Sequence, residues 1–294
     1  MSAYARPTTR DEALALLARP GAAVLAGGTD LAGQVDRGIR APELLVDLRD
    51  LGLDAIAVTP DGGVELGATV TLATLARADA LAPYAAVREA ASVAASPLLR
   101  AVGTVGGNLL QHTRCWYYRS PEVTCWLGGG STCYAQLGDH RKHGLAAGDC
   151  ISAHPSDLAP ALAACGAQVV LRAGEGSQRV VPLLDLYRLP SEERRSLHGL
   201  EPGEILTAVR LPAPPTASAY RRAGERAAFS FPLVSVAAAR TAEGTSLVTG
   251  GVANVPVALD LADPLAGLPG TDQTAWKRDL LSALVERTLA ALDD

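Results

Sequence analysis

The sequence has 294 residues, 48% of them hydrophobic and 19% charged, so a sizeable core is available and bulk disorder is not expected. This length suggests two domains, or one large domain with subdomains. The 26 basic and 31 acidic residues give a net charge of −5, which argues against a nucleic-acid partner. No run of 18 residues lacks a charged side chain, and the first residues lack the apolar segment of a signal peptide, so we expect no membrane span and a cytoplasmic protein.

The first 50 residues predict a strand–helix–strand unit. Thr9 and Glu12 have the spacing of a capping box before a helix over residues 11–17. An apolar strand is expected at 22–25, a helix from the following glycine pair to about residue 37, and a second strand at 44–48. Such a unit favours two parallel strands joined by a right-handed crossover.

The next region alternates between regular elements and glycine-rich stretches. Strands are expected at residues 55–58 and 64–68, and helices at 71–78 and 83–95. Residues 100–111 are punctuated by glycine and show no helical period, so no helix is expected there. Residues 112–152 are polar and rich in glycine and cysteine, and a stretch of this length without periodicity is usually functional or disordered.

Regular patterning returns after residue 156. We expect a helix at 157–165 and strands at 167–172, 179–181 and 204–211. The proline-rich segment 211–215 marks a boundary. Beyond it, the candidates are strands or helices at 219–222 and 233–239, a strand at 246–253 and an amphipathic helix at 276–292.

Two glycine loops are candidate anion sites. Gly27 and Gly28 follow a strand and precede a helix, and Gly106 and Gly107 precede Asn108. Adjacent glycines let backbone N–H groups face a phosphate, and a helix N-terminus adds positive potential. Neither loop is a dinucleotide fingerprint or a P-loop, and each by itself is more typical of an ordinary tight turn. Two such loops in one chain favour a long ligand with two phosphates.

The cysteines gather in the aperiodic stretch. Four of the five lie between positions 115 and 150, namely Cys115, Cys125, Cys133 and Cys150. The odd count argues against a disulfide framework, and clustered thiols in a reducing compartment more often bind metal. Their spacing matches neither a zinc ribbon nor a ferredoxin run, so a metal or cluster site, a redox pair and unrelated buried thiols remain alternatives. Cys165 lies on the apolar face of a predicted helix, and we expect a buried core thiol.

Four separated motifs carry a family resemblance. They are Ala-Gly-Gly-Thr-Asp-Leu at 26–31, Thr-Val-Gly-Gly-Asn-Leu at 104–109, Pro-Ser-Asp-Leu at 155–158 and Gly-Glu-Ile-Leu-Thr-Ala-Val-Arg-Leu-Pro at 203–212. In this order they resemble the FAD-binding (medium) subunit of the molybdenum hydroxylase family, which includes xanthine dehydrogenases, carbon monoxide dehydrogenase and aldehyde oxidoreductases. The resemblance extends over residues 1–260.

This resemblance implies an α+β protein with an FAD-binding fold of the vanillyl-alcohol-oxidase (PCMH) type, made of two α/β subdomains and a C-terminal α+β domain. The implied FAD-binding subdomains are residues 1–53 and 54–212, the second carrying a cysteine-rich insertion at 112–152. Residues 216–294 would form a shortened version of the C-terminal domain of carbon monoxide dehydrogenase flavoproteins.

The resemblance also implies a set of FAD contacts and leaves the catalytic residues unknown. The assigned residues are Ala26, Gly27, Gly28, Thr29, Asp30, Leu31, Thr104, Gly106, Gly107, Asn108, Ser156, Asp157, Leu206 and Arg221. Residues 26–29 would hold the pyrophosphate, Asn108 and its neighbours the phosphates and ribityl chain, and Asp157 the ribityl or ribose hydroxyls. Leu206 would lie near the isoalloxazine, which Arg221 or Arg222 would approach. From the sequence alone, Asp157 is better explained as a first-turn residue that complements the helix dipole.

The segment Arg114-Cys115-Trp116-Tyr117-Tyr118-Arg119, with its long insertion, resembles a subgroup whose flavin subunit carries an extra [4Fe-4S] cluster. That subgroup includes 4-hydroxybenzoyl-CoA reductase and certain bacterial aldehyde oxidoreductases. The match implies that Cys115, Cys125, Cys133 and Cys150 are the cluster ligands. Four histidines flank the loop, and we expect them to form hydrogen bonds rather than to bind metal: His112, His140, His143 and His154.

We therefore expect an FAD-dependent oxidoreductase subunit, with FAD and a [4Fe-4S] cluster, that passes electrons between a partner and an external acceptor or donor. The implied partners are a small [2Fe-2S] subunit and a large molybdopterin subunit. One alternative is a free-standing FAD/[4Fe-4S] flavoenzyme, as a homo-oligomer, acting directly on a small molecule in a biosynthetic pathway. The other is a non-enzymatic scaffold whose cysteines hold zinc.

Overall fold

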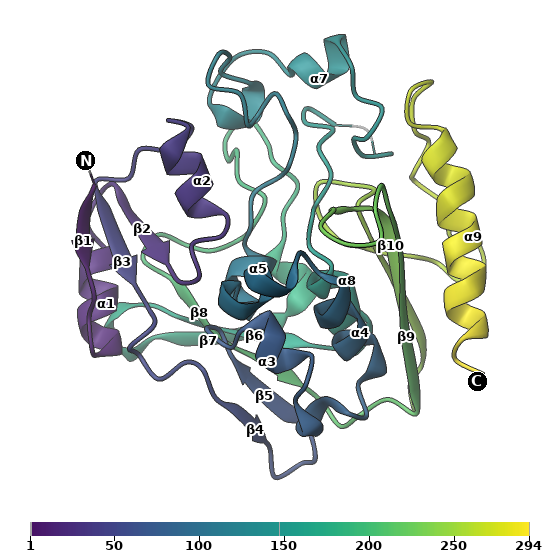
Figure 1. Ribbon diagram of the computed structural model, residues 1–294, viewed down its shortest axis with the longest axis horizontal. Coiled ribbons are helices and arrows are strands. Elements are labelled where there is room, and N and C mark those ends of the chain that lie inside the picture. The colour runs from purple at the N-terminus through teal and green to yellow at the C-terminus, as the bar shows by residue number, and fades with distance from the viewer. Residues whose placement is uncertain (1, 147, 294) are drawn as a thin grey trace.

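The computed structural model describes residues 2–146 and 148–293. Residues 1, 147 and 294 belong to the predicted ranges 1–53, 112–152 and 216–294 and lie outside the described residues. The two ends of the chain lie on opposite sides of the molecule (Figure 1). Within the described ranges, every helix is too short or too polar to cross a membrane.

A small parallel sheet forms the N-terminal edge of the molecule (Figure 1). Its elements are β1 (Ala3–Ala5), α1 (Arg10–Leu17), β2 (Ala22–Leu25), α2 (Leu31–Asp36) and β3 (Leu44–Asp47). The strand order is β1-β3-β2, and β2 pairs with β3 in parallel, which confirms the predicted parallel unit. Thr9 caps α1 by accepting a hydrogen bond from the backbone N–H of Glu12 at 3.3 Å.

A five-stranded antiparallel sheet lies at the centre, in the order β4-β5-β8-β6-β7. Its strands are β4 (Ile56–Val58), β5 (Val64–Gly67), β6 (Gln168–Arg172), β7 (Gln178–Pro182) and β8 (Ile205–Leu211). The helices in the same part of the chain are α3 (Leu72–Leu75), α4 (Ala85–Val93), α5 (Pro97–Val102), α6 (Val105–Leu109) and α8 (Leu158–Ala164), with 3-10 turns η1 (Asp79–Leu81), η3 (Gly174–Gly176) and η4 (Leu183–Leu186). Because β8 pairs with both β5 and β6, it joins segments more than 100 residues apart.

The expectation of no helix over residues 100–111 is wrong, because α5 ends and α6 lies within it. Ser96 caps α5, and Thr104 caps α6 by accepting from the N–H of Gly107 at 3.1 Å. A Cβ on Gly106 would lie 3.1 Å from the Ala68 carbonyl oxygen, so glycine permits α6 to pack closely against the end of β5. The same glycines interrupt the apolar period, which hides the helix in the sequence.

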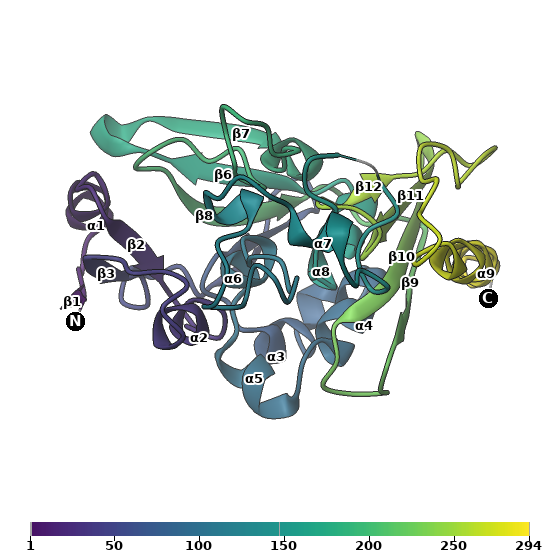
Figure 2. The same ribbon diagram turned by 90° about the horizontal axis from the view of Figure 1, so that it is seen from above.

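An antiparallel sheet with a long helix forms the C-terminal part, in the order β12-β11-β10-β9. Its elements are β9 (Ala217–Gly224), β10 (Pro232–Thr241), β11 (Gly244–Gly250), β12 (Val257–Ala258) and α9 (Trp276–Ala290). The candidates at 219–222 and 233–239 are therefore strands. Helix α9 covers the sheet from the outside, as Figure 2 shows.

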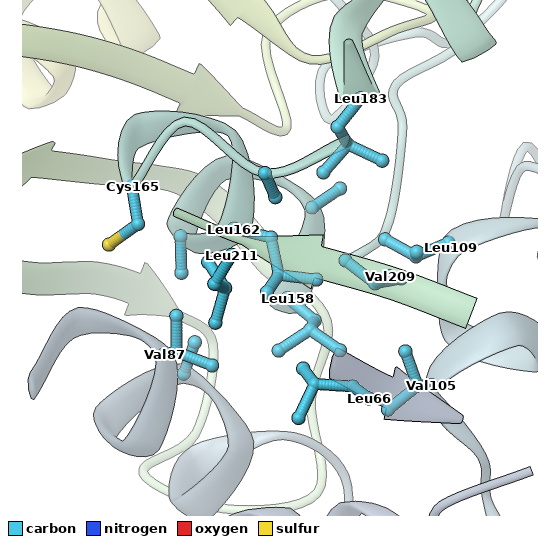
Figure 3. Packing of buried hydrophobic residues seen from close by; sticks show 14 of the residues in the cluster. Leu66, Val87, Val105, Leu109, Leu158, Leu162, Cys165, Leu183, Val209 and Leu211 are labelled. Atoms are coloured by element: carbon cyan, nitrogen blue, oxygen red, sulfur yellow. The ribbon is translucent and has the colours of Figure 1, made fainter. Parts of the chain in front are cut away.

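The main core lies between the central sheet and the helices. Leu158 and Leu162 of α8 pack beside Val209 and Leu211 of β8 (Figure 3). Cys165 belongs to this core and is only 1% exposed, which confirms the expected buried thiol. A second apolar cluster joins α9 to β10 and β11.

The carboxyl end of β3 carries a buried acid with a testable pH dependence. Burial alone would raise the pKa of Asp47, but hydrogen bonds from Arg49 and from the Tyr4 hydroxyl at 2.7 Å lower it to about 2. A lowered carboxyl pKa contributes stability above the unfolded value of about 3.9 and loses it as the pH falls through the folded value. We expect wild type to exceed Asp47→Asn by about 2 kcal/mol in free energy of unfolding at neutral pH, and the difference to shrink between about pH 4 and pH 2. Urea unfolding across this range measures it, and a constant difference would contradict the assignment.

Candidate functional site

Three adjoining pockets share lining residues, and together they are called the flavin groove below, after the expected ligand. The first pocket, about 300 Å³, lies between β2, α6 and β8. It shares Thr29, Asp30 and Thr104 with a second pocket of about 70 Å³. The second shares Arg114 and Phe231 with a third pocket of about 350 Å³, so each pocket adjoins the next.

The two glycine loops predicted from the sequence meet in this groove. A Cβ on Gly27 would lie 1.9 Å from the carbonyl oxygen of Val102, which precedes the second loop. Gly28 has a φ of +68°, a conformation that other residues rarely adopt. The two loops therefore meet at one place in the groove, where the N–H groups of Gly106 and Gly107 donate to the Ala68 carbonyl at 2.8 Å and to Thr104 Oγ1 at 3.1 Å.

Most of the expected FAD contacts line the groove. They are Ala26, Gly27, Gly28, Thr29, Asp30, Leu31, Thr104, Gly106, Gly107, Asn108, Asp157 and Leu206. Ser156 lies behind the lining, where its hydroxyl donates to Asn108 Oδ1 at 2.5 Å. Arg221 also lies outside the lining and pairs with Glu89 at 3.1 Å.

In the first pocket of the groove, two buried polar atoms have no partner in the described residues, namely Thr69 Oγ1 and His198 Nδ1. Buried polar atoms are normally hydrogen-bonded, so both are suited to a polar ligand. Burial lowers the pKa of His198 to about 4, which keeps the ring neutral at physiological pH. Neither residue belongs to a sequence motif, so sequence reasoning missed them. Both fit a group with polar edges, as FAD has.

Asp157 lies at the second pocket and is part of a buried network. Its Oδ1 accepts from the Tyr220 hydroxyl at 2.6 Å and from Arg222 Nη1 at 2.9 Å. The side chains of Arg222 and Asp157 are 9% and 5% exposed. Arg222, an expected flavin contact, therefore positions Asp157 between the central and C-terminal sheets.

Breaking this buried pair is expected to destabilise the protein strongly. Asp157→Asn would leave the Arg222 guanidinium buried without a counter-charge, which costs roughly 3–5 kcal/mol in free energy of unfolding. The half-exposed pair Arg210–Glu65 provides a matched control, because Glu65→Gln should change stability by less than about 1 kcal/mol. Urea denaturation of both variants measures the difference, and equal effects would show that the Asp157 network contributes no more than a surface pair.

The cysteine loop, residues 112–152 without 147, contains η2 (Trp126–Gly128) and α7 (Tyr134–Leu137) and runs over the top of the molecule in Figure 1. Its thiols Cys115, Cys125, Cys133 and Cys150 all line one small cavity, whereas Cys165 lies in the core. Burial raises the pKa of the Cys115 thiol to about 12 and also raises that of Cys125 and Cys150. Thiolates there require a positive group to stabilise them.

The size and lining of this cavity bear on which kind of metal site the four thiols could form. Within the described ranges, no three histidine, cysteine, aspartate or glutamate side chains are close enough to hold a single metal ion. The four thiols border a common space, which is the arrangement that a larger sulfur-ligated group would need. The free volume is about 10 Å³, room for roughly one water, so a cluster would fit only if the loop opened.

Of the four histidines near the loop, His140 and His143 make ring hydrogen bonds of the expected kind. His140 Nε2 lies 2.8 Å from Thr271 Oγ1, and His143 Nε2 lies 3.1 Å from Cys115 Sγ. Burial lowers the pKa of His154 to about 3, and its ring packs edge-on against Tyr187. His112 lines the flavin groove and stacks on Tyr118 with ring centroids 5.8 Å apart.

The flavin groove and the cysteine cavity are neighbours. Cys115 lines both the third pocket of the groove and the cavity. Tyr118, stacked on His112 of the first pocket, lines the cavity as well. The two spaces therefore share the Cys115 side chain as part of their walls.

Known proteins resemble this chain in sequence and in fold. Residues 1–214 match the family described as FAD binding domain in molybdopterin dehydrogenase. The chain is 39% identical to the aldehyde oxidoreductase FAD-binding subunit PaoB of Escherichia coli (strain K12) over 88% of this chain and 84% of that one. It is 30% identical to the carbon monoxide dehydrogenase medium chain of Afipia carboxidovorans over 99% of this chain and 88% of that one. Reconstituted CO dehydrogenase from Oligotropha carboxidovorans contains a chain of similar fold, with a TM-score of 0.74, 25% identity and coverage of 99% and 97%.

These likenesses agree with the groove and its two glycine loops. The mixed α/β architecture with its PCMH-type FAD-binding domain confirms the expected fold class. The chain thus belongs to the FAD-binding subunits of the molybdenum hydroxylase family and is an FAD-dependent oxidoreductase component.

Proposed function

We propose that FAD lies along the flavin groove with its pyrophosphate at the contact between the two glycine loops. The single observation that carries this proposal is the 1.9 Å separation between a Cβ on Gly27 and the Val102 carbonyl oxygen, which brings both anion loops to one place. Thr104, Gly107 and Asn108 contact the phosphates and ribityl chain, and Leu206 contacts the ring system. FAD supplies exchange between two-electron and one-electron chemistry, while the protein binds, orients and shields it.

The cysteine loop is proposed to hold a [4Fe-4S] cluster through Cys115, Cys125, Cys133 and Cys150. Support comes from the common cavity of the four thiols and from its position next to the flavin groove. His143 donates or accepts a hydrogen bond at the Cys115 sulfur, and such contacts influence cluster potentials.

We further propose that the chain works in a complex and passes electrons between a molybdopterin large subunit with a [2Fe-2S] small subunit and an external partner. The relatives are named as an FAD-binding subunit and a medium chain, which supports a role beside other subunits. The N-terminal, central and C-terminal sheets are proposed to mark subdomains at residues 1–53, 54–212 and 216–294.

An anaerobic absorption spectrum, with flavin, iron, sulfide and zinc quantified on the same sample, tests the cofactor proposal. We expect one FAD with about four iron and four sulfide per chain. FAD without iron would reject the cluster and keep the flavin assignment. A colourless protein with stoichiometric zinc would reject both, in favour of a zinc-binding scaffold.

A further inference from the structure

Asp30 directly follows the first glycine loop, but its carboxylate is bound by the cysteine loop. Oδ2 accepts from the backbone N–H of His112 at 2.9 Å. Oδ1 accepts from Arg114 Nη1 at 2.5 Å and from Arg119 Nη2 at 2.8 Å. The side chains of Asp30, Arg114 and Arg119 are 14%, 26% and 13% exposed, so these charge pairs are largely shielded from water.

The two arginines also define the start of the cysteine loop. Arg119 Nε donates to the Thr113 carbonyl at 2.8 Å, and its Nη2 donates to the His112 carbonyl at 3.0 Å. Arg114 Nη2 donates to Gln111 Oε1 at 2.8 Å. The Arg114 guanidinium also stacks over the Phe231 ring, with its central carbon 4.4 Å from the ring centroid. The backbone that carries Cys115 is therefore held by the same guanidinium groups that neutralise Asp30.

The signs of the charges on Asp30, Arg114 and Arg119 link this group of side chains to the flavin groove. Thr29 and Asp30 line the groove at the place where the two glycine loops meet. An uncompensated carboxylate beside a pyrophosphate would repel it, whereas one carboxylate with two guanidinium groups leaves a net positive charge. Burial by itself raises the pKa of Asp30, but the contacts with His112, Arg114 and Arg119 hold that pKa well below its usual range.

We propose that Asp30 is a positioning residue that couples the flavin groove to the cysteine loop. The docked loop neutralises Asp30 and so favours a diphosphate in the groove, and a diphosphate in the groove favours the docked loop to the same degree. This inference rests on the proposed binding of FAD, and it adds a residue-level link between the two sites. Docking of the loop would then hold Cys115 in the position from which it could act as a ligand.

A double-mutant cycle on the full chain without iron tests the coupling, with the FAD dissociation constant from flavin fluorescence as the readout. Arg119 does not line the groove, yet Arg119→Gln is expected to weaken FAD binding roughly tenfold, a usual size for coupling between sites. Adding Asp30→Asn to that variant should restore the affinity, because the carboxylate that needed neutralising is gone. Arg141→Gln is the matched control, since Arg141 lies in the same loop and its side chain is 68% exposed.

Thiol reactivity gives a second readout that does not depend on activity. In wild type and Arg141→Gln, saturating FAD should slow alkylation of the loop thiols at least about fivefold. In Asp30→Asn, at an FAD concentration that saturates this variant, the protection should be lost, because the carboxylate that joins the loop to the groove is gone. The alkylation experiment also tests the coupling if Arg119→Gln does not fold.

Three results would overturn the coupling: unchanged FAD affinity in folded Arg119→Gln, failure of Asp30→Asn to restore it, or full FAD-dependent protection in Asp30→Asn. A wild-type chain that binds no FAD would instead reject the proposed function, so the two failures are distinguishable.

Discussion

Replacing Cys125 with serine is expected to remove iron from the protein while FAD stays bound. Cys125 is 6% exposed and lines the cysteine cavity, but it does not line the flavin groove. A serine hydroxyl is a hard ligand and binds cluster iron less well than a soft thiolate does. After anaerobic reconstitution, iron and sulfide should fall well below the roughly four of each per chain expected for wild type. Metal, sulfide and flavin analysis of one sample measures this.

Cys165→Ser is the control for this experiment. Cys165 is buried in the main core, apart from the cysteine cavity, so the variant should keep both cofactors even if its stability is reduced. Loss of iron in Cys165→Ser together with full iron in Cys125→Ser would contradict the ligand set. Equal iron content in all variants would show that this loop does not bind the cluster.

Gly27→Val is expected to lower the affinity for FAD by one to two orders of magnitude. Its Cβ would lie 1.9 Å from the Val102 carbonyl oxygen, a backbone atom that cannot rotate away, so the two glycine loops must separate. Overpacking of this kind costs about 1–3 kcal/mol, and every 1.4 kcal/mol is tenfold in a dissociation constant. Titration of the flavin-free protein with FAD, followed by fluorescence, measures the change.

Gly33→Ala is the matched control, because Gly33 lies on α2 and a Cβ there meets no atom within 4 Å. Alanine also favours the helix, so stability should be equal or higher. Normal FAD binding by a folded Gly27→Val protein would place the pyrophosphate somewhere other than the contact between the glycine loops.

Local patterns predicted the regular elements wherever the apolar period is intact. The strand at 22–25 matches β2, and the helix at 276–292 corresponds to α9. Prediction failed at α6, because Gly106 and Gly107 interrupt the period and the helix depends on the Thr104 cap and on contact with Ala68. Only packing against another part of the chain reveals such an element.

The functional site also combines features that are visible in the sequence with features that only the folded chain creates. The glycine loops and the gathering of cysteines are visible in the sequence, because each is a local motif. The orphan atoms of Thr69 and His198 are not, since they matter only where the chain encloses a groove. Asp30 was expected to contact FAD as part of a motif, and its contacts with Arg114 and Arg119 depend on an approach between segments more than 80 residues apart.

The sequence by itself determined the family, the two glycine loops and the four thiols of the cysteine loop, because backbone freedom at glycine and sulfur chemistry at cysteine are properties of short segments. The tertiary structure decided that both loops face one groove, that the four thiols line one cavity beside it, and that Asp30 pairs with the cysteine loop rather than standing free. Distances between remote segments arise from packing the central sheet against its helices, which no local pattern encodes.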